Sequence, residues 1–297
     1  MYPDVSIIVP VFNDQEGLEK CLQRLGGQSY PRDRYEVIVA DNGSDRNIRD
    51  VVARYPRTRF ICEKRPGSYA ARNAGLTLAT GEIVGFTDSD CLPRHDWIER
   101  GVAALQNDVN LGLAGGRVVL FHRDPQRLSP GEFYQEICGF PQEKYIEEKR
   151  FAVTANVFTW RKVLDDVGHF SPQMKSSGDK EWGNRVFEAG YGQVYAEDVV
   201  VEHPSRHRLR DLVRKRRRIT GGRIQYNKIR GVEEPPLLEE FHRMRKFPEA
   251  SLERFRDHPL LESEKNRTRF RRIQYLINIS ELYEIFRLRL GGAPRRQ

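Results

Sequence analysis

Two carboxylates separated by one residue, Asp88 and Asp90, are the residues of this sequence with the clearest chemical potential. They follow the apolar run from Ile83 to Phe86, which is typical of a buried strand. If the strand continues to its tip, both side chains point the same way, because side chains alternate along a strand. Such a pair is costly to bury unless a cation shares it, and a hard divalent metal on a diphosphate fits that role. An Asp-x-Asp tripeptide is expected roughly once by chance in this composition, so the context has to decide.

The elements around this pair alternate between strands and helices. We predict strands over 5–11, 35–40, 59–62 and 83–86, and helices over 17–25, 48–55 and 68–79. This alternation predicts an α/β doubly wound sheet, in which ligands bind at the carboxyl ends of the strands. Three polar clusters fall at such ends: Asn13-Asp14, Asp41-Asn42 and Asp88 with Asp90. Their agreement indicates one shared site.

The second half of this region adds further elements. Helices are expected over 97–105 and 161–167, and strands over 111–120, 151–159 and 199–201. Asp179 stands just before a helix that ends at Gly190, so a simple N-cap is one interpretation of it.

Several classes of protein lack support in the sequence. Neither GxGxxG nor GxxxxGK[ST] occurs, which argues against a dinucleotide-binding Rossmann domain and a P-loop nucleotidase. No apolar run is long enough for a transmembrane helix, and the N-terminus lacks the features of a signal peptide. The four cysteines form no CxxC pair, so we expect free thiols and a cytoplasmic protein.

The basic charge lies in the last third of the chain. Residues 1–203 hold 25 Lys and Arg against 30 Asp and Glu, a net −5, whereas residues 204–297 hold 25 against 12, a net +13. We therefore expect a catalytic domain over 1–205 and a basic, mainly helical extension over 206–297. Such an extension favours anionic partners: phosphates, acidic lipid headgroups or nucleic acid.

Two helices are predicted in this extension. The first carries the run Arg214–Arg218 and is expected to break at Gly221-Gly222, and residues 231–236 are a predicted linker. The second spans 269–290 and has an apolar stripe: Phe270, Ile273, Ile277, Leu282, Phe286 and Leu290. This helix can pack on the catalytic domain, pair with another subunit, or lie on an anionic membrane surface.

An ordered set of motifs resembles a known family. The motifs are Pro-Val-Phe-Asn-Asp (10–14), Ala-Asp-Asn-Gly-Ser-Asp (40–45), Ala-Ala-Arg-Asn-Ala-Gly (70–75), Gly-Glu-Ile-Val-Gly-Phe-Thr-Asp-Ser-Asp (81–90), Thr-Ala-Asn (154–156) and Ser-Gly-Asp-Lys-Glu-Trp-Gly-Asn-Arg (177–185). Over about residues 4–205 the chain resembles the family-2 inverting glycosyltransferases of GT-A fold. The resemblance implies a mixed, Rossmann-like sheet and transfer of a sugar from a nucleotide-diphosphate sugar.

The resemblance also implies roles for individual residues. It implies a donor-nucleotide site formed by Pro10, Val11, Phe12, Asp14, Asp41, Asn42, Arg72, Asn73 and Asp88. It implies a Mg²⁺ or Mn²⁺ site at Asp88 and Asp90, with His203 as a further ligand or as a structural strand-end residue. It implies that Asp179 is the catalytic base, and that Asn156, Glu181 and Trp182 lie on the acceptor side.

Two positions depart from the family pattern. Asn42 stands where a second Asp usually receives the pyrimidine N3–H, and its amide oxygen can still accept that bond. Gly178-Asp179 replaces the more frequent Glu-Asp.

The implied enzyme is an inverting, metal-dependent, hexosyltransferase-type glycosyltransferase. It uses a UDP- or dTDP-type donor and a glycan, lipid-linked or small-molecule acceptor, in cell-envelope polysaccharide or glycolipid assembly. We also expect a cytoplasmic location, with peripheral contact at the inner face of the membrane. The C-terminal helix is expected to form an oligomer. Two alternatives remain at this point: a nucleotidyltransferase, whose glycine-rich loop after the first strand is missing here, and a nucleic-acid-binding protein that uses Arg214–Arg218.

Overall fold

The computed structural model describes residues 2–294 and divides into two compact units. Unit 1 consists of Met1–Val119, Phe140–Met174 and Gly178–His203. Unit 2 consists of Leu120–Gly139, Lys175–Ser177 and Pro204–Gln297. The sequence predicted a single boundary after residue 205. In the structure the last and longest segment of unit 2 begins at Pro204. Unit 2 also takes in two earlier segments, because these pack against its helices.

The described residues form one eight-stranded sheet in the order β3-β2-β1-β4-β7-β6-β8-β5. The strands are β1 (Val5–Val11), β2 (Tyr35–Asp41), β3 (Thr58–Cys62), β4 (Ile83–Thr87), β5 (Leu92–Pro93), β6 (Leu111–Phe121), β7 (Asn156–Trp160) and β8 (Gly192–Pro204). Strands β1 to β4 pair in parallel, whereas β7 is antiparallel to both β4 and β6. The predicted α/β class with a mixed sheet is confirmed.

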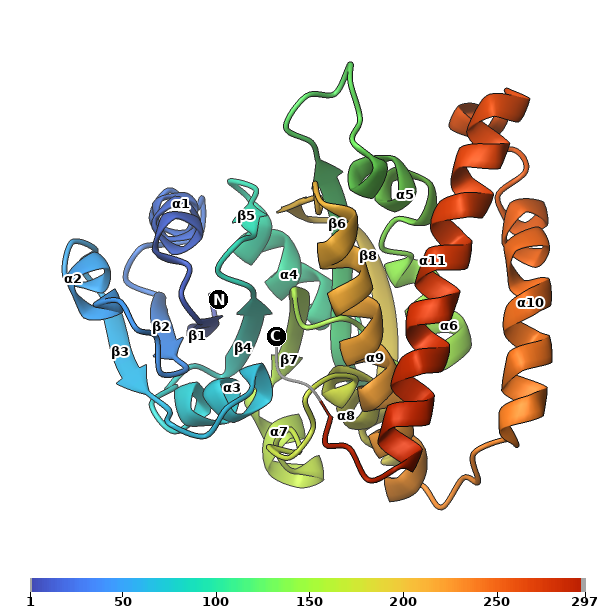
Figure 1. The fold of residues 1–297 in the computed structure, drawn as a ribbon. Helices are drawn as coiled ribbons and strands as arrows, with labels where there is room; N and C mark the ends of the chain where they lie inside the picture. The colour runs from blue at the N-terminus through green and yellow to red at the C-terminus, as the bar shows by residue number, and fades with distance from the viewer. Residues whose placement is uncertain (1, 295–297) are drawn as a thin grey trace. The chain divides into compact units, whose positions relative to one another are not determined.

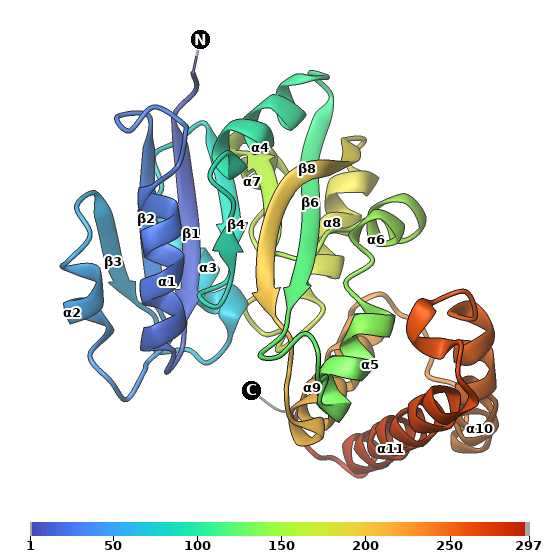
Figure 2. The same cartoon turned by 90° about the horizontal axis from the view of Figure 1, so that it is seen from above.

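Helices cover both faces of this sheet. They are α1 (Gln15–Gly26), α2 (Ile48–Val52), α3 (Ser68–Leu76), α4 (Trp97–Gln106), α6 (Gln142–Lys149), α7 (Arg161–Val167) and α8 (Gly178–Glu188). Figure 1 shows α1 and α3 on opposite sides of β1, β2 and β4. Every residue of β1 is buried, as expected for a strand covered on both faces, and Figure 2 shows it between β2 and β4.

Unit 2 is helical. Its helices are α5 (Pro130–Cys138), α9 (Leu209–Ile229), α10 (Leu237–Arg254), the 3₁₀ turn η1 (Pro259–Leu261) and α11 (Glu264–Arg289). Its core joins residues from α5 and α11 with η1: Phe133, Ile137, Leu261, Phe270, Ile273 and Ile277. Within residues 2–294, the helices are all too short or too polar to cross a membrane.

Helix α9 corrects one prediction about this unit. It runs without interruption through Gly221 and Gly222, which were expected to break it. A Cβ on Gly222 would lie 2.6 Å from the Cβ and the carbonyl oxygen of Ser176. The glycine therefore serves a close approach between α9 and the segment around Ser176.

Candidate active site at the carboxyl edge of the sheet

The loops after β1, β2 and β4 meet at one edge of the sheet. The N–H of Asn42 donates to the carbonyl of Val11 at 2.8 Å, which joins the ends of β2 and β1. The hydroxyl of Ser89, from the turn after β4, donates to Oδ2 of Asp14 at 3.2 Å. The predicted polar clusters therefore lie together, as the parallel topology requires.

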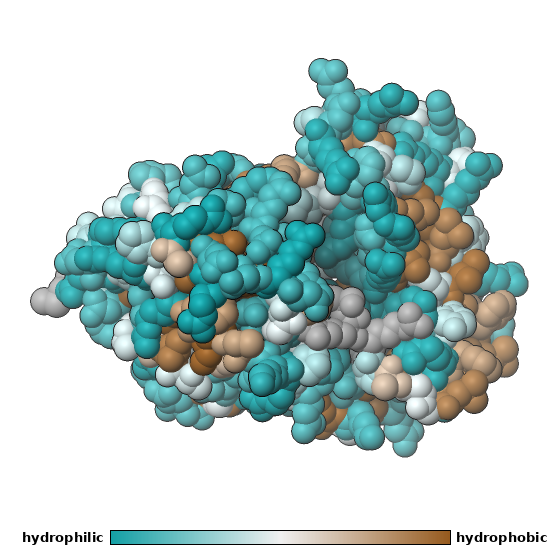
Figure 3. Space-filling view, turned by 60° about the vertical axis from the view of Figure 1, so that its left-hand side comes forward, coloured by the Kyte–Doolittle hydropathy of each residue, from teal (hydrophilic) through white to brown (hydrophobic). Residues whose placement is uncertain are grey.

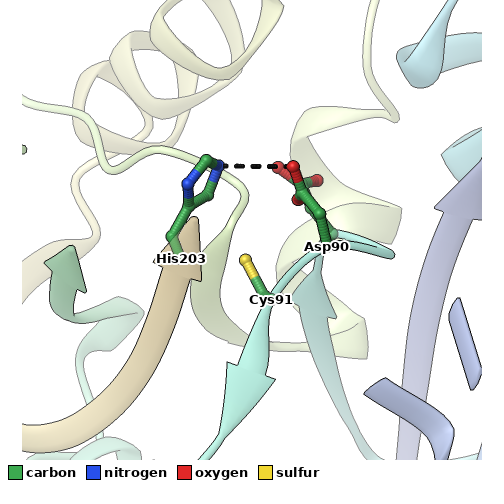
Figure 4. Close-up of side chains that lie close together, drawn as sticks. Asp90, Cys91 and His203 are labelled. Carbon is green, nitrogen blue, oxygen red and sulfur yellow. Dashed lines mark ion pairs between the residues drawn. The ribbon is translucent and has the colours of Figure 1, made fainter. Parts of the chain in front are cut away.

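Strand β4 ends at Thr87, so Asp88 and Asp90 lie in a turn beyond the strand. Their ligand atoms nevertheless gather with those of Cys91 and His203, all within 4.8 Å of one another. The imidazole Nε2 of His203, near the end of β8, lies 3.7 Å from Oδ2 of Asp90 (Figure 4). The two aspartates are about one-third exposed, at 36% and 37%, whereas the His203 ring is buried.

These residues form a donor set that fits a hard divalent cation. Carboxylate oxygens and an imidazole nitrogen both bind Mn²⁺, and carboxylates bind Mg²⁺. The thiol of Cys91 is fully buried, and this burial, together with the charges of Asp90 and Asp88, raises its pKa well above the ordinary value. Hard cations such as Mg²⁺ and Mn²⁺ prefer oxygen and imidazole ligands to sulfur, so the fitting ligands are the two aspartates and His203.

Arg72 brings positive charge to the same place. Its guanidinium is 2% exposed and forms an ion pair with Oδ1 of Asp88. Its Nε is buried and has no hydrogen-bond partner among the described residues. The buried guanidinium therefore keeps a fixed positive charge beside the turn that holds Asp88 and Asp90.

The predicted nucleotide site is largely preorganised by its own contacts. Asp41 is buried and accepts from the N–H and hydroxyl of Ser44. Asp14 caps α1 by accepting from the N–H of Gly17 at 3.0 Å. Pro10 and Val11 are buried in β1, and Phe12 is half-buried. These contacts hold the loops in one arrangement, which lowers the entropic cost of binding.

Asn42 has a structural task that the sequence did not reveal. Its amide nitrogen donates to the carbonyls of Glu63 and Arg65, and its amide oxygen accepts from the N–H of Gly67 at 2.7 Å. The side chain is 4% exposed and secures the loop between β3 and α3. The amide oxygen expected to receive a pyrimidine N–H therefore already accepts a backbone hydrogen bond.

Helix α3 connects the turn that holds Asp88 and Asp90 to Asp179. Arg72 reaches Asp88, and Tyr69, one helical turn earlier, donates its hydroxyl to Oδ1 of Asp179 at 3.1 Å. The guanidinium of Arg72 lies 5.8 Å from the centre of the Tyr69 ring. Asn73 exchanges two hydrogen bonds with the backbone of Phe170, so its amide has a structural role beside this site.

Tyr69 explains one departure from the family pattern. A Cβ on Gly178 would lie 2.7 Å from two carbons of the Tyr69 ring, so the ring occupies the space of any side chain there. Sequence reasoning did not select Tyr69. The contact joins residues far apart in the chain, so no local pattern indicated it.

The three residues expected on the acceptor side are all buried. Trp182 is 1% exposed and its indole N–H donates to the carbonyl of Gly168. Glu181 forms an ion pair with Arg185. Asn156 is fully buried, accepts from the indole of Trp97 and donates to backbone carbonyls of β6 and β8. Asn156 thus supports the sheet, and its place on the acceptor side stays a prediction.

Comparison with known proteins identifies the family. Residues 6–180 match the sequence model of Glycosyl transferase family 2, so the chain belongs to this family of glycosyltransferases. It is 35% identical over 228 residues to glycosyltransferase AglE of Haloferax volcanii, covering 75% of this chain and 74% of that protein. It is 27% identical over 220 residues to a pre-mycofactocin glycosyltransferase of Mycobacterium tuberculosis, covering 72% of this chain but only 45% of that protein.

Solved structures support the GT-A fold. A mannosyltransferase of Pyrobaculum calidifontis, determined with GDP-Man and Mn²⁺, superimposes with a TM-score of 0.64 at 23% identity. The match covers 97% of this chain and 87% of the mannosyltransferase. The chain is therefore a family-2 glycosyltransferase with a GT-A sheet and a helical second unit.

Proposed function

We propose that this enzyme transfers a hexosyl group from a nucleoside-diphosphate sugar to a hydroxyl acceptor, with inversion at the anomeric carbon. The observation that carries this proposal is the network of α3: Arg72 pairs with the carboxylate of Asp88, and Tyr69 holds the carboxylate of Asp179. One helix thereby connects the residues for the leaving group to the residue for the acceptor.

The leaving diphosphate needs positive charge as its bond to the sugar breaks. Asp88, Asp90 and His203 would hold a Mg²⁺ or Mn²⁺ ion, which would supply such charge. The Mn²⁺ of the Pyrobaculum mannosyltransferase lends support to this choice of cofactor. Arg72 adds a fixed guanidinium beside Asp88, whose positive charge favours the developing negative charge of the leaving group.

Asp179 acts as the general base. Its carboxylate takes the proton of the acceptor hydroxyl while the hydroxyl oxygen bonds to the anomeric carbon. The bond from that carbon to the diphosphate breaks, and its electron pair leaves with the diphosphate. A single displacement from the opposite face inverts the configuration.

Two finer assignments belong to the proposal. We propose a UDP- or dTDP-type donor. Because the mannosyltransferase was determined with GDP-Man, a GDP-sugar has to be tested beside these donors. The acceptor is a glycan, a lipid-linked sugar or a small molecule of cell-envelope polysaccharide assembly. The four free cysteines, of which Cys21 and Cys91 are buried, support a cytoplasmic location.

Membership in the glycosyltransferase family argues against both alternatives drawn from the sequence, a nucleotidyltransferase and a nucleic-acid-binding protein. Unit 2 gives a second argument against nucleic-acid binding. Arg216 and Arg217 form ion pairs with buried Glu281 and Glu284 of α11. Part of the basic run therefore stabilises the helical unit from within.

The test compares donor binding with donor hydrolysis. UDP-, dTDP- and GDP-sugars are titrated by calorimetry with Mn²⁺, and release of the nucleoside diphosphate into water is followed separately. The variant Asp179→Asn should bind its donor as the wild type does but lose hydrolysis by about 10²–10⁴-fold. Asp198→Asn, at a 60% exposed surface carboxylate, is the matched control. Equal loss of binding and hydrolysis would contradict the base assignment, and absence of binding to every donor would contradict the function.

A further inference from the structure

The outer side of α11 carries an unusual combination of residues. Six large side chains on this side are between 43% and 73% exposed: Tyr275, Leu276, Ile279, Tyr283, Phe286 and Leu290. We call them the α11 stripe. From Tyr275 to Leu290, the C-cap of α11, it spans sixteen residues, about 24 Å along the helix axis. Figure 3 shows brown residues gathered along its right-hand edge, whereas most of the remaining surface in that view is teal.

The exposed residues of this segment carry no negative charge. From Arg272 to Leu290, every exposed residue of α11 is either a member of the stripe or an arginine, namely Arg272 and Arg289. The two glutamates of the segment are buried. Glu281 pairs with Arg216 at 2.7 Å, and Glu284 pairs with Arg217 at 2.9 Å, both on the facing side of α9.

The apolar surface continues beyond the helix end. Arg289 donates to the carbonyl of Pro235, which places the start of α10 beside the C-terminal end of the α11 stripe. Leu237, Leu238 and Phe241 at the start of α10 are 38%, 68% and 52% exposed. An exposed apolar surface of this extent marks an interaction site.

We propose that the α11 stripe docks unit 2 on an anionic lipid surface. An amphipathic helix binds in the plane of such a surface when apolar and aromatic side chains enter the headgroup boundary and arginines meet anionic headgroups. The two exposed tyrosines suit that boundary because each has an apolar ring and a polar hydroxyl.

Charge decides between a lipid surface and a second copy of the chain. The spacing of Leu276, Ile279, Tyr283, Phe286 and Leu290 alternates between three and four residues, as in a coiled-coil seam. A parallel pair of stripes, however, sets each arginine beside its own copy, and an antiparallel pair sets Arg272 beside Arg289. Both glutamates between Arg272 and Leu290 are buried, so the exposed acidic residue nearest in sequence to the apolar surface is Glu239 at the start of α10. An anionic lipid surface, by contrast, attracts both arginines of the stripe face.

Vesicle flotation of the full-length protein tests the proposal. The vesicles are pure phosphatidylcholine, or phosphatidylcholine mixed with phosphatidylglycerol. The wild type should float with the mixed vesicles, float far less with the neutral ones, and lose binding as salt is raised. The double variant Ile279→Glu/Phe286→Glu should lower the partition coefficient by about tenfold or more. Val109→Glu, at an 83% exposed apolar residue of unit 1, should float as the wild type does.

Each other outcome overturns the proposal. If the wild type stays in the dense fraction, or if the double variant floats as well as Val109→Glu, the stripe is not a lipid-binding surface. If the wild type does not float, and analytical ultracentrifugation shows that it is a dimer whereas the double variant is a monomer, then a second copy of the chain covers the α11 stripe. Nucleotide binding of the double variant is measured in the same preparation. If it equals that of the wild type, the flotation result bears on the α11 stripe alone and not on the proposed sugar transfer.

Discussion

Replacing Tyr69 with phenylalanine tests whether α3 positions the catalytic base. The change removes only the hydroxyl that donates to Oδ1 of Asp179, and it keeps the ring that packs at 5.6 Å, between ring centres, from Phe170. A hydrogen bond to a charged group contributes roughly 1.5–3 kcal/mol. If orienting the carboxylate requires that bond, kcat should fall about 10- to 100-fold, because each 1.4 kcal/mol corresponds to a factor of ten.

The assay separates orientation from binding and folding. Donor hydrolysis gives kcat and KM, calorimetry gives donor affinity, and thermal unfolding reports stability. We expect kcat alone to change, since the hydroxyl faces Asp179 and the ring contacts remain. Tyr191→Phe is the matched control, because Tyr191 also donates to an aspartate, Asp166, but at an exposed position.

Two results would refute this reasoning. The first is a kcat for Tyr69→Phe equal to that of Tyr191→Phe, which would leave the hydroxyl without a role. The second is a further loss when Tyr69→Phe is added to Asp179→Asn, because a residue that acts only through the base has nothing more to lose once the base is gone.

Three further predictions concern the metal and two glycines. Asp90→Asn should weaken Mn²⁺ binding in the presence of a nucleoside diphosphate by at least about tenfold, measured by calorimetry, and unchanged affinity would remove Asp90 from the metal site. Gly178→Ala should lower the free energy of unfolding by about 1–3 kcal/mol in denaturant titrations, since its Cβ would lie 2.7 Å from an aromatic ring. Gly222→Ala should cost a similar amount, about 1–3 kcal/mol, through its contact with Ser176, whereas Gly221→Ala, with 3.4 Å to its nearest neighbour, should cost much less. Equal effects of the two alanines would contradict the close-approach explanation.

Local patterns in the sequence were sufficient for the class of fold and for the edge that carries the site. The apolar run of β1 and the strand–helix alternation follow from side-chain periodicity, which acts over a few residues. The placement of Asp88 and Asp90 at a strand end follows from the same patterns. The expected reason, side-chain alternation along a continuing strand, was wrong. Strand β4 ends at Thr87, and the two aspartates come together through the turn that follows it.

The same local patterns misjudged the two glycines of α9. Gly221 and Gly222 were expected to break α9, but a glycine inside a helix can equally serve a close contact with a segment far away in the chain. Asn156 satisfies buried carbonyls of β6 and β8, a structural role that the sequence did not reveal. Both outcomes depend on neighbours that no window of sequence contains.

Contacts between distant residues account for what the sequence left unresolved. Tyr69 and Asp179 lie 110 residues apart in the chain, and Asp90 and His203 lie in different strand-end segments. The unbroken apolar face of α11 emerges only when Glu281 and Glu284 turn inward to the arginines of α9. A residue type and its spacing specify which chemistry is available, but packing specifies which side chains meet, because burial and pairing are properties of the whole folded chain.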